Sequence, residues 1–216
     1  MVGRVKTVAF QGVEVLDIDV QVQMLGGQVA FTVVGLPDKA VGESRERVRA
    51  ALYSLGLALP DKRIAVNLAP ADVLKEGSHF DLPIAIALLT VMGVLPDEEM
   101  ARFYALGELA LDGAVTAVAG VLPAAVNASA HDLGLICPAA CGGEAAWAGD
   151  DLEILAAPSL LSLINHFKGT QILTRPKPRL QEEEAPGRHL DLRDIKGQET
   201  AVWWRKRTQT GQDWRC

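Results

Sequence analysis

Residues 64–92 read IAVNLAPADVLKEGSHFDLPIAIALLTVM. The first five residues are mostly apolar and typical of a strand. A polar loop, ADVLKEGSHFD (71–81), then opens onto the apolar run 82–92, which has the composition of a buried helix. Asp81 stands where an N-cap is expected, and Pro83 is tolerated in the first turn of a helix. A strand, a loop and a buried helix in this order favour an α/β arrangement.

Two strand-like runs lie closer to the N-terminus. Apolar and polar residues alternate over 16–24, which is the period of a strand with one solvent-facing side. A Gly-Gly turn at 26–27 leads into a second apolar run at 29–34. The two runs are therefore predicted to form a hairpin.

A helix is predicted at residues 35–56, between the run 29–34 and the stretch 64–92 quoted above. Residues 35–56 carry apolar side chains at helical spacing, and Glu43 and Arg47 lie one turn apart, where they can pair. Gly56 is a natural C-terminal stop for this helix.

The second half of the chain alternates in the same manner. Asp112-Gly113 is a turn signal between two of its strand-like runs. Strands are predicted at 103–111, 115–118, 133–137 and 152–156, and helices at 123–130 and 159–167. Hairpins mixed with strand-to-helix crossovers indicate a two-layer α/β (α+β) domain over residues 1–168.

The composition changes after this domain. Residues 169–189 hold three prolines and an acidic run, Glu182 to Glu184, and are interpreted as an extended linker. Residues 190–201 are interpreted as the start of a further module. Residues 202–216 contain three of the four tryptophans without periodicity, and are interpreted as a frameshifted, unstructured tail.

Composition restricts the classes of function. The 216 residues are 49% hydrophobic, and their net charge of −6 argues against a free-standing nucleic-acid binder, because neutralising phosphates requires clustered Lys and Arg. The N-terminus shows no signal-peptide pattern, and no apolar run approaches the roughly 20 residues of a membrane helix. No membrane partner is therefore expected.

The cysteines favour the cytoplasm. Three cysteines, Cys137, Cys141 and Cys216, make an odd number that suits a reducing compartment. The motif CPAAC supplies at most two ligands of a zinc site that normally requires four. Cys137 and Cys141 are therefore interpreted as ordinary loop or core residues, and no metal site is expected.

Three segments resemble the ComM/YifB family of magnesium-chelatase-related AAA+ proteins. They are VVGLPDKAVGESRERVRAAL (33–52), VNLAPADVLKEGSHFDLPIAIALL (66–89) and GELALDGAVTAVAGVLPA (107–124). The resemblance resumes at DLRDIKGQETA (191–201), which is similar to the family's lead-in to its AAA+ module. It implies a ribosomal-S5-domain-2-like, Lon-protease-like fold for the main domain.

The resemblance also implies where the family's activity lies. In full-length members this domain accompanies a ring-forming AAA+ ATPase that, in ComM, is a helicase driving DNA branch migration during natural transformation. Self-association through that ring, DNA binding, ATP and magnesium are expected only with the ATPase module. No G-x-x-x-x-G-K-[ST] phosphate loop occurs in these 216 residues, so the chain is interpreted as truncated before its motor, with no cofactor of its own.

A Ser-Lys peptidase is the sharpest enzymatic alternative, since Lon-type domains use a serine activated by a lysine. Laid against Lon with a short insertion in the loop, the sequence places Asp81 at the serine position, or His79 without the insertion. Leu122 falls at the lysine position, and none of these residues supports that chemistry. Ser78 and Lys75 remain as a shifted serine and lysine nearby in the sequence. No catalytic residue is therefore assigned, and the alternatives are a cryptic Ser-based peptidase or an ATP-dependent enzyme.

The arginine-rich helix offers one candidate interaction surface. Arg45, Arg47 and Arg49 spread over more than one helix face, at about 100° per residue. They are interpreted either as a solvated face paired with nearby glutamates or as a surface for DNA or a neighbouring subunit. The sequence thus favours a non-catalytic accessory domain of a ComM/YifB-type ATPase.

Overall fold

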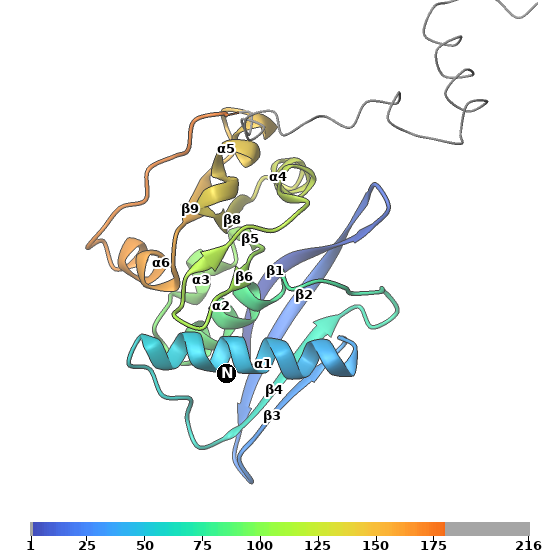
Figure 1. Cartoon of the computed structure of the whole chain (residues 1–216), viewed down its shortest axis with the longest axis vertical. Coiled ribbons are helices and arrows are strands. Elements are labelled where there is room, and N and C mark those ends of the chain that lie inside the picture. The colour runs from blue at the N-terminus through green and yellow to red at the C-terminus, as the bar shows by residue number, and fades with distance from the viewer. Residues whose placement is uncertain (1, 180–216) are drawn as a thin grey trace, which may run out of the picture. The chain divides into compact units, whose positions relative to one another are not determined.

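The computed structural model describes residues 2–179, apart from the side chain of Asp38 (Figure 1). The strands are β1 (Val2–Gln11), β2 (Glu14–Leu25), β3 (Ala30–Val34), β4 (Arg63–Ala69), β5 (Phe103–Ala105), β6 (Glu108–Leu109), β7 (Val115–Thr116), β8 (Gly134–Pro138) and β9 (Ile154–Ala157). The helices are α1 (Asp38–Ser54), α2 (Asp81–Val91), α3 (Asp97–Met100), α4 (Val121–Ala130), α5 (Gly142–Ala145) and α6 (Leu160–Phe167), with 3₁₀ turns η1 (Ala139–Cys141) and η2 (Ala146–Ala148).

Within the described residues, seven strands form one mixed sheet in the order β3-β4-β2-β1-β5-β8-β9, and β6 and β7 form a separate pair. β1 and β2 are an antiparallel hairpin that pairs from Val2 opposite Gln23 to Gln11 opposite Glu14. β4 is antiparallel to β2, whereas the β3–β4, β1–β5, β5–β8 and β8–β9 pairs are parallel. The α/β prediction is confirmed.

The predicted hairpin between the runs 16–24 and 29–34 is wrong. β4 lies between β2 and β3, and among residues 2–179 β3 pairs only with β4, in parallel. The physical reason is the helix that follows β3. A strand, a crossover helix and a second strand in the same direction form a β-α-β unit. The chain leaves β3, crosses through α1 and returns as β4, which pairs with β3 in parallel. Alternation of side chains predicted the strands correctly, although it carried no information on their neighbours.

Helix α2 lies at the centre of the core. All of its residues from Asp81 to Thr90 are buried, because the helix packs against β1 and β2 on one side and α1 on another. The approach to β1 is close enough that a Cβ at Gly3 would lie 2.6 Å from the Ala87 carbonyl oxygen. The predicted buried helix at 82–92 is thereby confirmed.

The two faces of the sheet are covered differently. Along β5, Phe103 and Ala105 point into the core under α1, α2 and α6, while Tyr104 points into a second cluster with α4 and α5. Helices therefore cover both faces of the sheet at β5, β8 and β9 (Figure 1). Across β2 and β4 the alternate residues stay exposed, as at Gln23 and Asn67, so this half has two layers.

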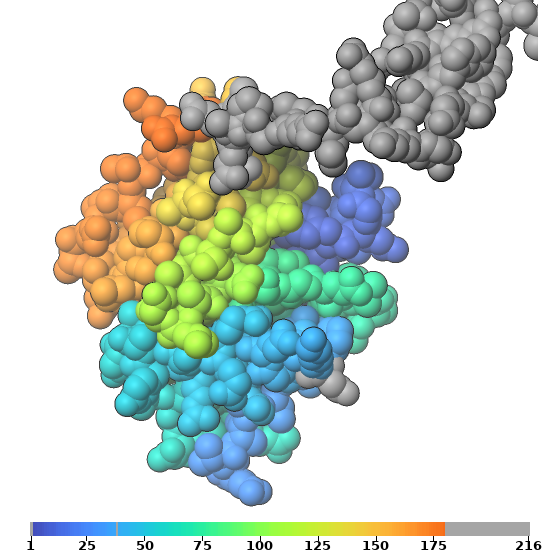
Figure 2. All heavy atoms as spheres, viewed as in Figure 1, coloured from blue at the N-terminus to red at the C-terminus, as the bar shows by residue number. Residues whose placement is uncertain are grey.

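The turn between β6 and β7 packs on α1 (Figure 2). Gly113, in this turn, has φ of +84°, and a Cβ there would lie 3.2 Å from the Ser54 hydroxyl oxygen. The Asp112-Gly113 turn signal is thus confirmed, and the glycine meets both a backbone and a steric requirement.

Residues 170–179 form neither helix nor strand and run from α6 to α5 (Figure 1). The backbone amide of Arg179 donates to Gly143 O at 3.1 Å, and Trp147 Nε1 donates to Arg179 O at 3.2 Å. Arg175 Nη2 donates to Gly149 O at 2.7 Å. The predicted linker (169–189) is described only to this point, and the interpretations of 190–201 and 202–216 fall outside the described residues.

Among residues 2–179, none of the helices combines the length and the apolar content needed to cross a membrane.

Candidate functional site

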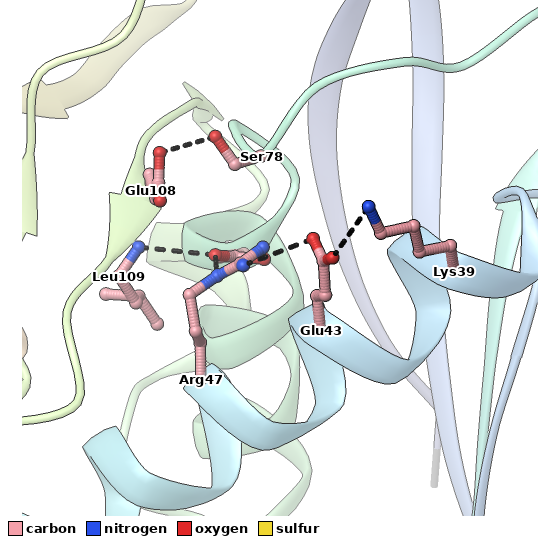
Figure 3. Close-up of polar contacts among 7 residues, drawn as sticks. Lys39, Glu43, Arg47, Ser78, Glu108 and Leu109 are labelled. Atoms are coloured by element: carbon pink, nitrogen blue, oxygen red, sulfur yellow. Dashed lines mark hydrogen bonds and ion pairs between the residues drawn. The ribbon is translucent and has the colours of Figure 1, made fainter.

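A buried ion pair joins α1 to the start of α2. Arg47 Nε donates to Asp81 Oδ2 at 2.5 Å, and Arg47 Nη2 donates to Asp81 Oδ1 at 3.2 Å (Figure 3). The Asp81 side chain is 1% exposed and that of Arg47 is 21% exposed. This is the two-pronged geometry in which a guanidinium binds a carboxylate most strongly.

Asp81 is not the N-cap that the sequence suggested. Phe80 occupies the N-cap position, no side chain caps the helix, and Asp81 is the first helical residue. Its carboxylate turns outward from the helix axis and also accepts from the backbone amide of Leu109 at 3.4 Å. A carboxylate at the first turn still interacts favourably with the helix dipole, but its main partner is the guanidinium of another helix.

The surroundings of the pair shift the pKa values of both side chains. Burial raises the pKa of Asp81, and the hydrogen bond from Arg47 opposes that shift. The pKa of Arg47 is raised by its hydrogen bond to Asp81. The Ser44 hydroxyl is near enough to favour the ionised carboxylate, yet it is buried without a partner of normal hydrogen-bond geometry among the described residues. We therefore regard Arg47 as the group that holds Asp81 in place.

Weaker polar contacts surround this pair at the surface. Glu43 lies 3.9 Å from Arg47, which confirms the predicted pairing one turn apart, and Lys39 lies 3.7 Å from Glu43. Ser78 Oγ donates to Glu108 Oε2 at 2.5 Å, joining the loop before α2 to β6 (Figure 3).

Lys75 is engaged with its own loop. Its ammonium donates to Pro70 O at 2.5 Å and to Val73 O at 2.9 Å, and the residue is 1% exposed. Burial lowers the pKa of this ammonium. None of the hydrogen bonds among the described residues links Lys75 to Ser78. The shifted serine and lysine are therefore not joined as a dyad in this conformation.

Asp81 and Leu122, which the resemblance to Lon implied as the dyad positions, lie on different helices. Leu122 lies in the first turn of α4, where its backbone amide donates to Glu144 Oε1 at 3.2 Å. Asp81, at the other position, is bound to α1 and β6. The structure thus assigns each residue a structural contact of its own.

His79 is a core residue. Its ring nitrogen Nε2 lies 2.9 Å from Val8 O, and its ring lies 4.1 Å from that of Phe80 and 5.6 Å from that of Phe10. Burial lowers the pKa of His79. The neutral imidazole therefore joins the loop before α2 to β1.

The CPAAC cysteines are both buried, which confirms the interpretation as core residues. Burial raises the pKa of Cys137 to about 12, so its thiol is protonated at neutral pH and unreactive. Across residues 2–179, no group of three or more His, Cys, Asp or Glu side chains is arranged to hold a metal ion.

The arginines of α1 separate onto two faces. Arg47 points toward α2, whereas Arg45 and Arg49 are exposed and line a hollow beside β3. Arg45 Nε lies 3.3 Å from Glu46 Oε1. Residues 45, 47 and 49 therefore do not form one basic patch.

The sequence of this chain matches a family model and several known proteins. A family model described as subunit ChlI of Mg-chelatase matches residues 20–140. The chain is 38% identical over 196 residues to the competence protein ComM of Haemophilus influenzae. It is 37% identical over 209 residues to YifB of Escherichia coli and 36% identical over 207 residues to YifB of Salmonella typhimurium. This chain belongs to the ComM/YifB family.

The alignments with these ComM/YifB relatives include most of this chain but only part of theirs. They cover 89% of this chain with ComM and 90% with each YifB protein. The chain spans only about 38% of the length of each of the three relatives. The buried pair lies within the matched range of the family model, since both Arg47 and Asp81 fall between residues 20 and 140.

Sequence reasoning did not find the Arg47–Asp81 pair. The two residues are 34 positions apart, and local periodicity predicts only neighbours within one element. One signal was present: a carboxylate that opens an otherwise apolar, buried helix needs a cation or a set of donors to satisfy it.

Proposed function

We propose that residues 2–179 form a non-catalytic accessory domain of a ComM/YifB-type protein. The observation that carries this proposal is the Arg47–Asp81 ion pair. Its carboxylate is buried and hydrogen-bonded. The resemblance to Lon implies that this residue stands where a Lon-type peptidase has its serine. A carboxylate held in this way cannot be acylated, so the position contributes stability in place of catalysis.

The same pair argues against ATP binding by the described residues. The β4–α2 unit has the strand, loop and helix order of a phosphate-binding loop, in which helix amides and a lysine contact the phosphates. Here the carboxylate of Asp81 stands at the first turn of α2, and Lys75 donates to carbonyls of its own loop. ATP therefore does not fit these residues, and we assign ATP and magnesium chemistry to an AAA+ module.

Within a full-length family member, we propose that this domain supports assembly of the ring or DNA handling. A domain exchange tests this role. Residues 1–180 of this chain replace the matching part of Haemophilus influenzae ComM, and transformation frequency is measured in a comM-deleted strain. We expect the chimera to restore transformation above the level given by ComM without that part. A chimera that performs no better than the shortened ComM contradicts the proposal.

The second candidate is a cryptic serine peptidase, which the Ser78–Glu108 hydrogen bond favours. Glu108 Oε2 lies 2.5 Å from Ser78 Oγ, within reach to accept its proton. Ser78→Ala in the chimera distinguishes the two functions. Transformation should be unchanged if the domain has an accessory role, whereas the substitution should abolish any peptidase activity. Casein hydrolysis by the full 216-residue chain, abolished by the same substitution, would establish the peptidase.

A further inference from the structure

The sheet has a free edge at β3. β3 is the first strand of the sheet and pairs with β4 alone among the described residues. Figure 1 shows it at the margin of the sheet, with α1 passing nearby. Backbone groups on the outer side of such a strand have no strand partner, and they are a template for pairing with another chain.

A hollow of about 440 Å³ opens at the start of β3, between the β3–β4 pair and α1. Its walls are the start of β3, one face of α1 and the segment that leads into β4. Apolar side chains of Val29, Phe31, Leu59 and Ile64 contribute to the lining, and Val29 is 62% exposed. An extended segment lying beside β3 could direct an apolar side chain into this hollow.

Cations predominate among the charged residues of the hollow. Three basic residues, Arg45, Arg49 and Lys62, face two acidic ones, Glu46 and Asp61. Arg45 is paired with Glu46. Over residues 2–179, neither Arg49 nor Lys62 has a carboxylate within ion-pair distance. These two cations are available to an acidic ligand, on a chain whose net charge is −6.

We propose that the free edge of β3 binds an extended, acidic peptide segment of a partner protein, which adds as a further strand to the sheet. The backbone of β3 supplies hydrogen bonds, the hollow accepts an apolar side chain, and Arg49 and Lys62 pair with carboxylates. The site goes beyond the accessory role proposed above, and it does not use the Arg47–Asp81 pair.

Two other occupants fit less well. A second copy paired edge to edge would bring two sets of unpaired cations to one seam, and like charges at an interface disfavour association. Binding to DNA requires many clustered cations to neutralise its phosphates, whereas this hollow has only two cations without a carboxylate partner among residues 2–179, Arg49 and Lys62, which suit a short acidic segment better.

The test uses the full 216-residue chain and fluorescein-labelled nine-residue peptides in which Val alternates with Glu. Binding is measured by fluorescence anisotropy at low salt. A peptide with Lys in place of Glu tests charge, and the Val-Glu peptide with alternate backbone amides methylated tests strand pairing. The double variant Arg49→Glu/Lys62→Glu removes both cations. Lys168→Glu is the matched single control, on an exposed lysine just after α6.

We expect the Val-Glu peptide to bind, the double variant to weaken binding about tenfold or more, and Lys168→Glu to have little effect. Methylation of the peptide backbone should weaken binding to a similar degree, because it removes the strand hydrogen bonds. Circular dichroism of each variant confirms that it is folded.

Four results would overturn the proposal. They are no detectable binding of the Val-Glu peptide, equal binding of the Lys peptide, equal binding of the methylated peptide, or no effect of the double variant. A labelled 20-base-pair duplex that binds tightly and loses affinity in the double variant would assign the surface to DNA. Sedimentation velocity showing a dimer that the double variant dissociates would assign it to a second copy.

Discussion

At the scale of single residues, Asp81 shows how a charged side chain is kept inside a core. It is 1% exposed and opens a helix whose next nine residues are all buried. Two guanidinium hydrogen bonds and one backbone amide satisfy it. Removing one partner of such a pair leaves the other charge buried and uncompensated, which costs more than the pair contributes.

The first prediction concerns this pair. Arg47→Ala should lower the free energy of unfolding by about 3–5 kcal/mol, because it leaves the buried Asp81 carboxylate without a counter-charge. Urea unfolding followed by circular dichroism measures the change. Arg102→Ala is the control, since its pairs with Glu99 and Glu153 are at the surface and should be worth less than about 1 kcal/mol. Equal losses in the two variants would show that the pair does not stabilise the core.

The second prediction concerns His79 and pH. Its folded-state pKa is lowered from 6.5, chiefly by burial, so the unfolded chain takes up the proton first. The stability associated with a neutral His79 is complete above about pH 6.5 and is lost as the pH falls toward the folded pKa, by at most about 1.4 kcal/mol per pH unit. His79→Gln should therefore flatten the dependence of unfolding free energy on pH below 6.5. The same slope in both proteins would contradict this assignment.

At the scale of secondary-structure elements, the contact of α2 with β1 leaves no room for a side chain at Gly3. A Cβ added to Gly3 would lie 2.6 Å both from the Ala87 carbonyl oxygen and from Val91 Cγ2. The backbone of β1 therefore approaches the backbone of α2 where no side chain separates them. This approach keeps the central helix against the middle of the sheet.

The third prediction follows from that contact. Gly3→Ala should destabilise the protein by about 1–3 kcal/mol, because either β1 or α2 must move to accept a methyl group. Gly26→Ala is the matched control, since nothing lies within 4 Å of its added Cβ and its φ is not positive. Thermal unfolding distinguishes them: Gly3→Ala should lower the melting temperature, whereas Gly26→Ala should leave it unchanged or slightly raised. An unchanged melting temperature for Gly3→Ala would show that β1 and α2 pack less closely than the Gly3–Ala87 distance indicates.

At the scale of the whole molecule, residues 2–179 belong to one compact unit. The segment after α6 belongs to it, because Arg175 and Arg179 bond to backbone and side-chain groups around α5. Leu173 adds to this attachment, with its backbone amide donating to His166 Nδ1 at 3.0 Å.

The fourth prediction uses two shortened chains. A protein ending at Leu180 retains these contacts, and its melting temperature should match that of the full chain within a degree or two. A protein ending at Gly169 loses them, and its melting temperature should fall by about 2–8 °C, the range expected for about 1 kcal/mol or slightly more. Calorimetry measures both. A large fall on ending the chain at Leu180 would show that residues beyond 180 stabilise the domain.

Most elements of this protein could be predicted from the sequence, although β1 was not predicted and the strand predicted at 103–111 is divided between β5 and β6. Alternating spacing predicted the strand at 16–24 and helical spacing the helix over 35–56, because side-chain period is a local property of the backbone. Apolar composition predicted the buried helix at 82–92. Family membership was also visible in the sequence segments, and the comparisons confirm it.

Tertiary structure alone decided how those elements meet. The position of β3 beside β4, the pairing of Arg47 with Asp81 and the separation of Arg47 from Arg45 and Arg49 all depend on it. The pairing joins residues 34 positions apart. Periodicity reports which face of an element is apolar, but a strand's neighbour and a charge's partner are chosen when whole elements pack, through crossover geometry and the cost of leaving a buried charge unpaired.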